Sequence, residues 1–302
     1  RDVEIAQRIA DLHRQYGAPR QVVCSFAKNT VKYTTEIVRI WVEAGICAEG
    51  SVALQTTDPV TLENVARSNI RVEKYDALAD EFRRHRLPIV TDLLMGLPGA
   101  TVESFKADLQ RCLDQEVTPR MMETVVLPNS PMNDPAYKER FAIEIDDADI
   151  VVATSSYTRT DFEEMKRLRL LFRAFEHFGL LRHVFRWLQI DHGVRALDLI
   201  HEVDRAIEAD PGRFPLLTWV GRYFDLVTVP PGGWPPFYDE VSELLKERYD
   251  LADDPGLAAV IQLQEFLMPR RGRRFPDVVT LDHDYMAWVD HHRAGGSAEA
   301  VA

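Results

Sequence analysis

Two hydrophobic periodicities alternate along the first half of the chain. Apolar residues recur at helical spacing over residues 1–16, 34–44, 59–67, 73–84 and 101–113, and they form short runs of strand length at 21–26, 51–55, 89–95 and 121–127. Helices that alternate with strands predict a parallel sheet with crossover helices. Because a closed barrel of this type needs eight strands, the four visible strands predict an open or partial (β/α) TIM-like barrel, or the second half of a larger one.

The strand at Ile89–Met95 carries the most informative local pattern. It is apolar except for Asp92, and it stops in the turn Gly96-Leu97-Pro98-Gly99, after which Thr101 is expected to cap a helix. A carboxylate in a buried strand is unfavourable unless it is paired or faces a polar cavity. Asp92 is therefore expected either to cap local backbone or to hold a ligand.

The pattern changes after Leu127, where prolines mark an irregular connection. A short strand is predicted at 150–153, and the capping-box pattern Thr160-Asp161-Phe162-Glu163 predicts a long helix to about Phe178. The remainder to Asp290 is expected to be mainly helical. The predicted organisation is thus an α/β domain over residues 1–155, a helical region over 156–294 and a disordered tail over 295–302.

Composition and charge exclude several classes of function. The 302 residues are 46% hydrophobic with a formal net charge of −12, which argues against a nucleic-acid-binding surface. No apolar run is long enough to span a membrane, so no membrane association is expected. Cys24, Cys47 and Cys112 lie far apart in sequence, which fits a reducing, cytoplasmic compartment and offers no metal-ligand spacing.

Polar residues follow the predicted strands at the edge where parallel α/β folds bind ligands. These candidates are Lys28 and Asn29 after the first strand, Gln55 at the end of the second, Asp92 in the third and Asn129 after the fourth. Arg67 adds a cation where the helix after the second strand ends. An arginine fork suits a carboxylate, and an aspartate accepts hydrogen bonds from paired ribose hydroxyls. Together these groups would fit an amino-acid nucleoside.

Three segments, in order and spacing, carry a resemblance to a known family. Ser51-Val52-Ala53-Leu54-Gln55-Thr56-Thr57-Asp58-Pro59, Arg67-Ser68-Asn69-Ile70 and Asp92-Leu93-Leu94-Met95-Gly96-Leu97-Pro98-Gly99 resemble the second half of radical S-adenosylmethionine (SAM) enzymes such as the oxygen-independent coproporphyrinogen oxidases. The resemblance covers about residues 1–170. It implies that Arg67 holds the methionyl carboxylate of SAM, Asp92 the ribose and Gln55 a further polar edge, with backbone near Leu94 at the adenine. Independently of the resemblance, Gly96 and Gly99 are expected to let the backbone approach a neighbouring group closely.

Other segments are similar to the branch of this superfamily that has an amino-terminal cobalamin-binding domain. They are Lys28-Asn29, Val126-Leu127-Pro128-Asn129-Ser130-Pro131-Met132 and Asp134-Pro135-Ala136-Tyr137. The resemblance therefore implies SAM, a [4Fe-4S] cluster and cobalamin as cofactors. It also implies radical chemistry, such as methyl transfer, rearrangement or cyclisation, on a small-molecule or peptide substrate, with Lys28, Asn29 and Asn129 as candidate substrate contacts.

The chain departs from the family in its cysteines. The family's Cys-x3-Cys-x2-Cys loop, whose thiolates hold the cluster, has no counterpart here, and neither has its Gly-Gly-Glu-like segment. The simplest interpretation is a fragment whose cobalamin domain and first barrel strands lie upstream and whose partner is that missing amino-terminal half. Such a chain alone is expected to lack activity and to associate through unpaired strand edges.

Two alternatives remain open at this stage. The first is a non-catalytic nucleoside-binding or regulatory module derived from a radical SAM barrel. The second is a cluster-independent barrel lyase or hydrolase, for which Asp92, Lys28 and Glu123 are the only candidate groups.

Overall fold

The computed structural model describes residues 1–26, 33–67, 71–224, 229–270, 272–274 and 276–293. The chain divides into two compact units, residues 1–166 and 167–302. The predicted tail at 295–302 lies outside the described residues.

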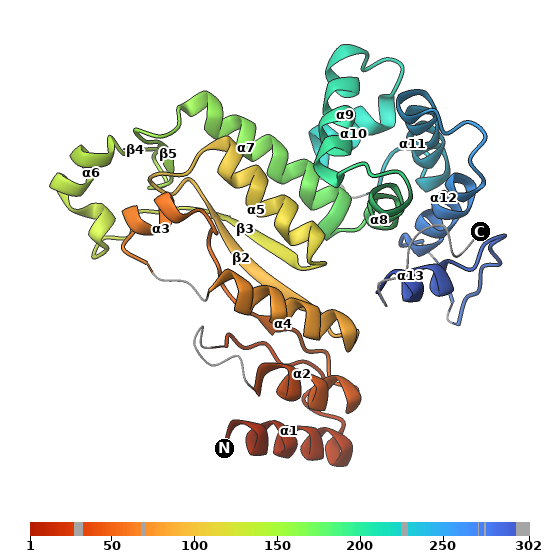
Figure 1. Cartoon of the computed structure of the whole chain (residues 1–302), viewed down its shortest axis with the longest axis horizontal. Coiled ribbons are helices and arrows are strands. Elements are labelled where there is room, and N and C mark those ends of the chain that lie inside the picture. Colours follow the sequence, from red (N-terminus) through yellow and green to blue (C-terminus); the bar gives the residue numbers. More distant parts are fainter. Residues whose placement is uncertain (27–32, 68–70, 225–228, 271, 275, 294–302) are drawn as a thin grey trace. The chain divides into compact units, whose positions relative to one another are not determined.

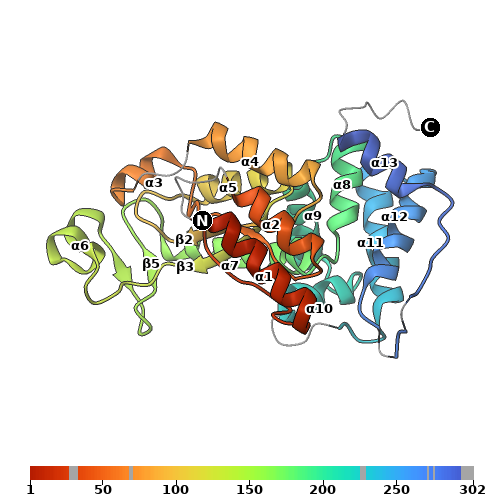
Figure 2. The same cartoon turned by 90° about the horizontal axis from the view of Figure 1, so that it is seen from below.

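The first unit alternates helices and short strands (Figure 1). Its elements are α1 (Asp2–Tyr16), α2 (Thr34–Glu43), β1 (Gly50–Ser51), α3 (Pro59–Asn64), α4 (Val72–Arg84), β2 (Ile89–Met95), α5 (Val102–Asp114), β3 (Thr118–Glu123), η2 (Pro131–Asn133), α6 (Pro135–Phe141), β4 (Glu144–Ile145), β5 (Val151–Ala153) and the start of α7 (Arg159–Phe172). Helices α1 and α2 lie side by side in both views (Figures 1 and 2) and share a small apolar core around Ala6, Ile37 and Trp41.

The central sheet has three parallel strands in the order β1-β2-β3. The mixed α/β class is therefore confirmed, whereas the prediction of four strands is wrong. Residues 21–26 form a single parallel bridge, Gln21 to Cys47, and their further bonds to the β1 side are isolated: the amide of Val22 donates to Cys47 and that of Phe26 to Ser51. A regular ladder needs continuous pairing, and no described segment pairs with the other edge of 21–26.

Two other strands have different bounds from those predicted. The strand predicted at 121–127 begins and ends earlier, at Thr118–Glu123, because all six of its residues pair with β2 from Val90 to Met95. The strand predicted at 51–55 is reduced to β1 and an isolated bridge between Gln55 and Leu93. Partner pairing, rather than local propensity, sets these boundaries.

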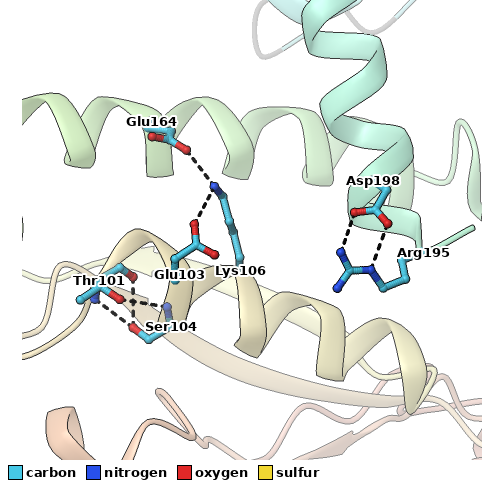
Figure 3. A network of polar contacts seen from close by, with 7 residues as sticks. All are labelled: Thr101, Glu103, Ser104, Lys106, Glu164, Arg195 and Asp198. Carbon is cyan, nitrogen blue, oxygen red and sulfur yellow. Dashed lines mark hydrogen bonds and ion pairs between the residues drawn. The ribbon is translucent and has the colours of Figure 1, made fainter.

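Helix caps fix where the sheet's helices begin. Thr101 caps α5 as predicted, because its hydroxyl accepts from the amide of Ser104 at 3.0 Å while the Ser104 hydroxyl accepts from the amide of Thr101 at 2.9 Å (Figure 3). The box predicted at Thr160 forms two residues earlier, where the hydroxyl of Thr158 accepts from the amide of Asp161 and donates to its carboxylate. The ammonium of Lys106 on α5 joins Glu103 and Glu164 (Figure 3).

Beyond residue 167 every described element is helical. The predicted helix to about Phe178 is present in two parts, because α7 ends at Phe172 and the chain continues as a π-helical turn, η3 (Arg173–His177). It is followed by α8 (Arg182–Asp191), α9 (Ala196–Ala209), α10 (Pro215–Tyr223), α11 (Trp234–Tyr249), α12 (Pro255–Leu267) and α13 (Tyr285–Arg293). At the start of α9, Arg195 binds the carboxylate of Asp198 through two nitrogens (Figure 3). Across the described residues, no helix combines the length and the apolar character needed to cross a bilayer.

Candidate functional site

The two faces of β2 differ in burial. Its odd-numbered side chains are buried, with Leu93 and Met95 each 1% exposed, whereas Asp92 and Leu94 on the even face are half-buried. The ring of Phe82 on α4 closes against β1, since a Cβ added at Gly50 would lie 2.5 Å from it. The even face is therefore the more open surface of the sheet, and it carries the one carboxylate of β2.

Backbone hydrogen bonds hold Gln55 beside Asp92. The amide of Gln55 donates to the carbonyl of Asp92 at 2.7 Å, and the amide of Leu94 donates to the carbonyl of Gln55 at 2.8 Å. Gln55 has a φ of 65°, a left-handed conformation that is uncommon for a residue other than glycine. The structure thus brings together three of the predicted residues at one position of the sheet edge.

Asp92 pairs with Arg120 from β3, which directly faces it in register. The Nε of Arg120 lies 2.8 Å from Asp92 Oδ1, and its Nη2 lies 2.7 Å from the hydroxyl of Ser51. Sequence reasoning missed Arg120, because the strand was predicted to begin one residue later, at Met121.

Arg67 has an unsatisfied buried nitrogen. Its Nε is buried and has no hydrogen-bond partner among the described residues, and burial lowers the pKa of its guanidinium. A buried, unpaired N–H is unfavourable by about 1–3 kcal/mol. Arg67 follows α3, with its amide bonded to the carbonyl of Leu62.

The turn after β2 is held tightly by the segment that follows β5. The hydroxyl of Tyr157 donates to the carbonyl of Gly96 at 2.9 Å, and the amide of Gly99 donates to the hydroxyl of Ser156 at 3.0 Å. Gly96 has a φ of 89°, and a Cβ there would lie 3.0 Å from the carbonyl oxygen of Val151. Only glycine fits this position without a shift in the neighbouring backbone.

A buried carboxylate on α5 anchors the turn that follows Gln55. Oδ1 of Asp108 accepts from the amide of Thr57 at 2.8 Å and from its hydroxyl at 2.6 Å. Asp108 is 4% exposed, and burial raises the pKa of its carboxyl despite these hydrogen bonds. In the same turn, Asp58 caps α3, because its Oδ2 accepts from the amide and the hydroxyl of Thr61.

The remaining sequence candidates do not join this group. Asn129 is exposed in the turn at 128–130, and Lys28 and Asn29 lie outside the described residues. Glu123 ends β3, and it has an interaction partner.

The described residues offer no metal site. No three His, Cys, Asp or Glu side chains among them cluster so that they could hold a metal ion. Cys24 is half-buried, Cys47 exposed and Cys112 buried within α5, and all three are free thiols. The cysteines of this chain therefore do not fit an iron–sulfur cluster, which needs several thiolates around one centre.

The fold defines an α/β protein in which polar residues gather on one face of a parallel three-stranded sheet. The chain is 32% identical over 145 residues to the cobalamin-dependent radical SAM methyltransferase TokK of Streptomyces tokunonensis, covering 47% of this chain and 21% of that protein. It is 33% identical over 137 residues to the 2-(S-pantetheinyl)-carbapenam-3-carboxylate methyltransferase of Streptantibioticus cattleyicolor, covering 45% of this chain and 20% of that protein. No family model matches the chain.

The similarity to two methyltransferases, one of them a radical SAM enzyme by name, supports a relationship with the radical SAM superfamily. The matches extend over about a fifth of the length of these curated relatives.

Proposed function

We propose that this chain is the SAM-binding part of a cobalamin-dependent radical SAM methyltransferase. The observation that carries the proposal is the pairing of Gln55 with Asp92 and Leu94, which gathers three separately predicted groups at the carboxyl edge of the sheet. The similarity to the two methyltransferases supports the same reaction class.

Each group has a role that its chemistry suits. Arg67 binds the methionyl carboxylate of SAM through its guanidinium fork. Asp92 accepts hydrogen bonds from the ribose hydroxyls, Gln55 offers an amide to a further polar edge, and backbone at Leu94 and Gly96 approaches the adenine. Lys28, Asn29 and Asn129 are proposed substrate contacts.

The chain's own contribution is to bind and orient SAM, not to generate the radical. In radical SAM enzymes a reduced iron–sulfur cluster supplies the electron that cleaves SAM, and the cysteines here do not provide its ligands. We infer that the ligands of the cluster and the cobalamin site belong to a further part of the protein. That part packs against this chain and completes a barrel.

Equilibrium binding of S-adenosylhomocysteine tests the proposed site. This SAM product retains the carboxylate and the ribose and needs no cluster chemistry, so dialysis with the intact protein that carries this chain is sufficient. Arg67→Gln is expected to weaken binding about tenfold or more, because a charge-assisted hydrogen bond stabilises by about 1.5–3 kcal/mol.

Arg222→Gln, at the end of α10 in the other unit, is the matched control and should leave the dissociation constant unchanged. Unaltered binding in Arg67→Gln, or no binding by the unsubstituted protein, would contradict the proposal.

A further inference from the structure

Arg120 lies on the open face of the sheet, and protein groups surround its guanidinium. Its Nε is bound to Asp92 and its Nη2 to the hydroxyl of Ser51, while its Nη1 is 3.6 Å from Glu49 Oε1. Ser51 is 4% exposed, so one partner is fixed within the packed sheet. A single side chain of β3 thus contacts Asp92 on β2, Ser51 on β1 and Glu49 just before β1.

This arrangement directs Arg120 toward protein groups. Its Nε and Nη2 are hydrogen-bonded to protein oxygens and its Nη1 lies 3.6 Å from a carboxylate oxygen, so the protein engages all three nitrogens. Arg120 therefore acts on its neighbours, above all on Asp92. Its ion pair with Asp92, at 2.8 Å, is shorter than its ion pair with Glu49, at 3.6 Å.

The carboxylate of Asp92 is held by one oxygen only. Oδ1 accepts from Arg120, while Oδ2 has no hydrogen-bond partner among the described residues, and the side chain is 22% exposed. A carboxylate fixed through one oxygen loses its rotational freedom and presents the other oxygen in a constant direction. Oδ1 keeps a second lone pair beside its bond to Arg120, so the two oxygens together can accept from a pair of adjacent hydroxyl groups.

We propose that Arg120 is a positioning residue that orients the Asp92 carboxylate toward the vicinal diol of the ribose of SAM. The inference rests on the proposed function, since it takes SAM as the ligand of this edge. Arg120 does not contact the ligand. Its removal acts through Asp92, and the effect depends on whether the ligand has both hydroxyl groups.

The test compares the intact protein's dissociation constants for S-adenosylhomocysteine and for its 2′-deoxy analogue, which lacks one hydroxyl. The unsubstituted protein is expected to prefer the diol about tenfold, since a hydrogen bond to a charged group stabilises by about 1.5 kcal/mol or more. In Arg120→Gln this preference should fall to about twofold or less, while binding of the deoxy analogue changes little.

Arg120→Lys should retain part of the preference, because an ammonium still donates to Asp92 but cannot also reach Ser51 in a fork. In the double variant with Asp92→Asn, Arg120→Gln should add no further loss, since both changes remove the same interaction.

Arg111→Gln is the matched control. Arg111 on α5 forms an ion pair of similar exposure with Asp76 at 2.6 Å, outside the candidate site, so its loss should alter stability but not the diol preference. Equal weakening of both ligands in Arg120→Gln, or an unchanged preference, would overturn the positioning role while leaving the proposed function intact. Failure of the unsubstituted protein to bind either ligand would overturn both.

Discussion

At the scale of single residues, Asp108 is the buried carboxylate on which the turn after Gln55 depends. Burial raises its pKa in the folded protein above the unfolded value of about 3.9. At a pH between the unfolded and the folded pKa, the Asp108 carboxyl holds a proton in the folded state that it has lost in the unfolded state. The contribution of this group to stability is therefore greatest at low pH and falls as the pH rises through the folded pKa.

Asp108→Asn should remove this pH dependence while keeping an acceptor oxygen for Thr57. The free energy of unfolding of the variant minus that of the unsubstituted protein, measured by urea titration, should rise as the pH increases from 4 to 7. A difference that is flat or falls over this range would contradict the assignment.

At Gly96, both the left-handed backbone conformation and the lack of space disfavour any larger residue. Gly96→Ala places a Cβ 3.0 Å from the carbonyl oxygen of Val151 and 3.1 Å from the hydroxyl of Tyr157, in a left-handed conformation that alone is unfavourable by about 1–2 kcal/mol. Gly17→Ala is the control, because Gly17 has a φ of 70° but no atom within 4 Å of the added Cβ. Thermal unfolding should show the larger loss of stability for Gly96→Ala, and equal losses would contradict the close packing of this turn.

At the scale of elements, Thr158 and Thr160 are two possible caps at the start of α7. Thr158→Ala is expected to lower the free energy of unfolding by about 1 kcal/mol, the usual effect of losing an N-cap. Thr160→Ala, two residues further on and also exposed, should be nearly neutral. Urea unfolding of both variants makes the comparison, and the reverse order of effects would restore the cap predicted from sequence.

The sequence is sufficient to predict elements whose signal is local. The apolar run Ile89–Met95 and the cap at Thr101 locate β2 and α5, and Asp92 was recognised because a carboxylate is exceptional in such a strand. The predicted bounds are less accurate for elements that depend on a partner. Strand β3 begins at Thr118 because it pairs with β2, although Pro119 and Arg120 are not typical strand residues.

The supporting residues of the site were not predictable for a related reason. Asp108 and Thr57 are 51 positions apart, and Arg120 and Asp92 are 28 apart, so neither contact leaves a local pattern. Only the alignment of neighbouring strands and the packing of α5 bring these side chains together.

At the scale of the whole molecule, residues 21–26 have an open edge, a side of the backbone without a partner among the described residues. The amides of Val22 and Phe26 donate toward β1, whereas those of Val23 and Ser25 have no backbone acceptor among the described residues, and Val23 is 71% exposed. Beside this edge an apolar groove of 430 Å³ lies between α1 and α2, lined in part by Ile5, Phe26 and Trp41. Edges of this kind pair readily with other chains.

We therefore expect the 302-residue chain alone to self-associate through this edge. Val23→Lys should shift it toward the monomer in sedimentation velocity, because a charged side chain on an edge strand disfavours pairing. Val278→Lys is the control, since Val278 is 83% exposed elsewhere in the chain. A monodisperse, unsubstituted monomer at micromolar concentration would contradict this prediction.

The central claim is that this chain binds SAM for radical chemistry. The most direct measurement is the amount of 5′-deoxyadenosine formed from SAM by the intact protein after reconstitution with iron and sulfide and reduction. We expect the nucleoside to form and its yield to fall at least tenfold in Asp92→Asn and Arg67→Gln, while Arg222→Gln retains full yield. No 5′-deoxyadenosine from the unsubstituted protein, or an unchanged yield in both site variants, would contradict the account.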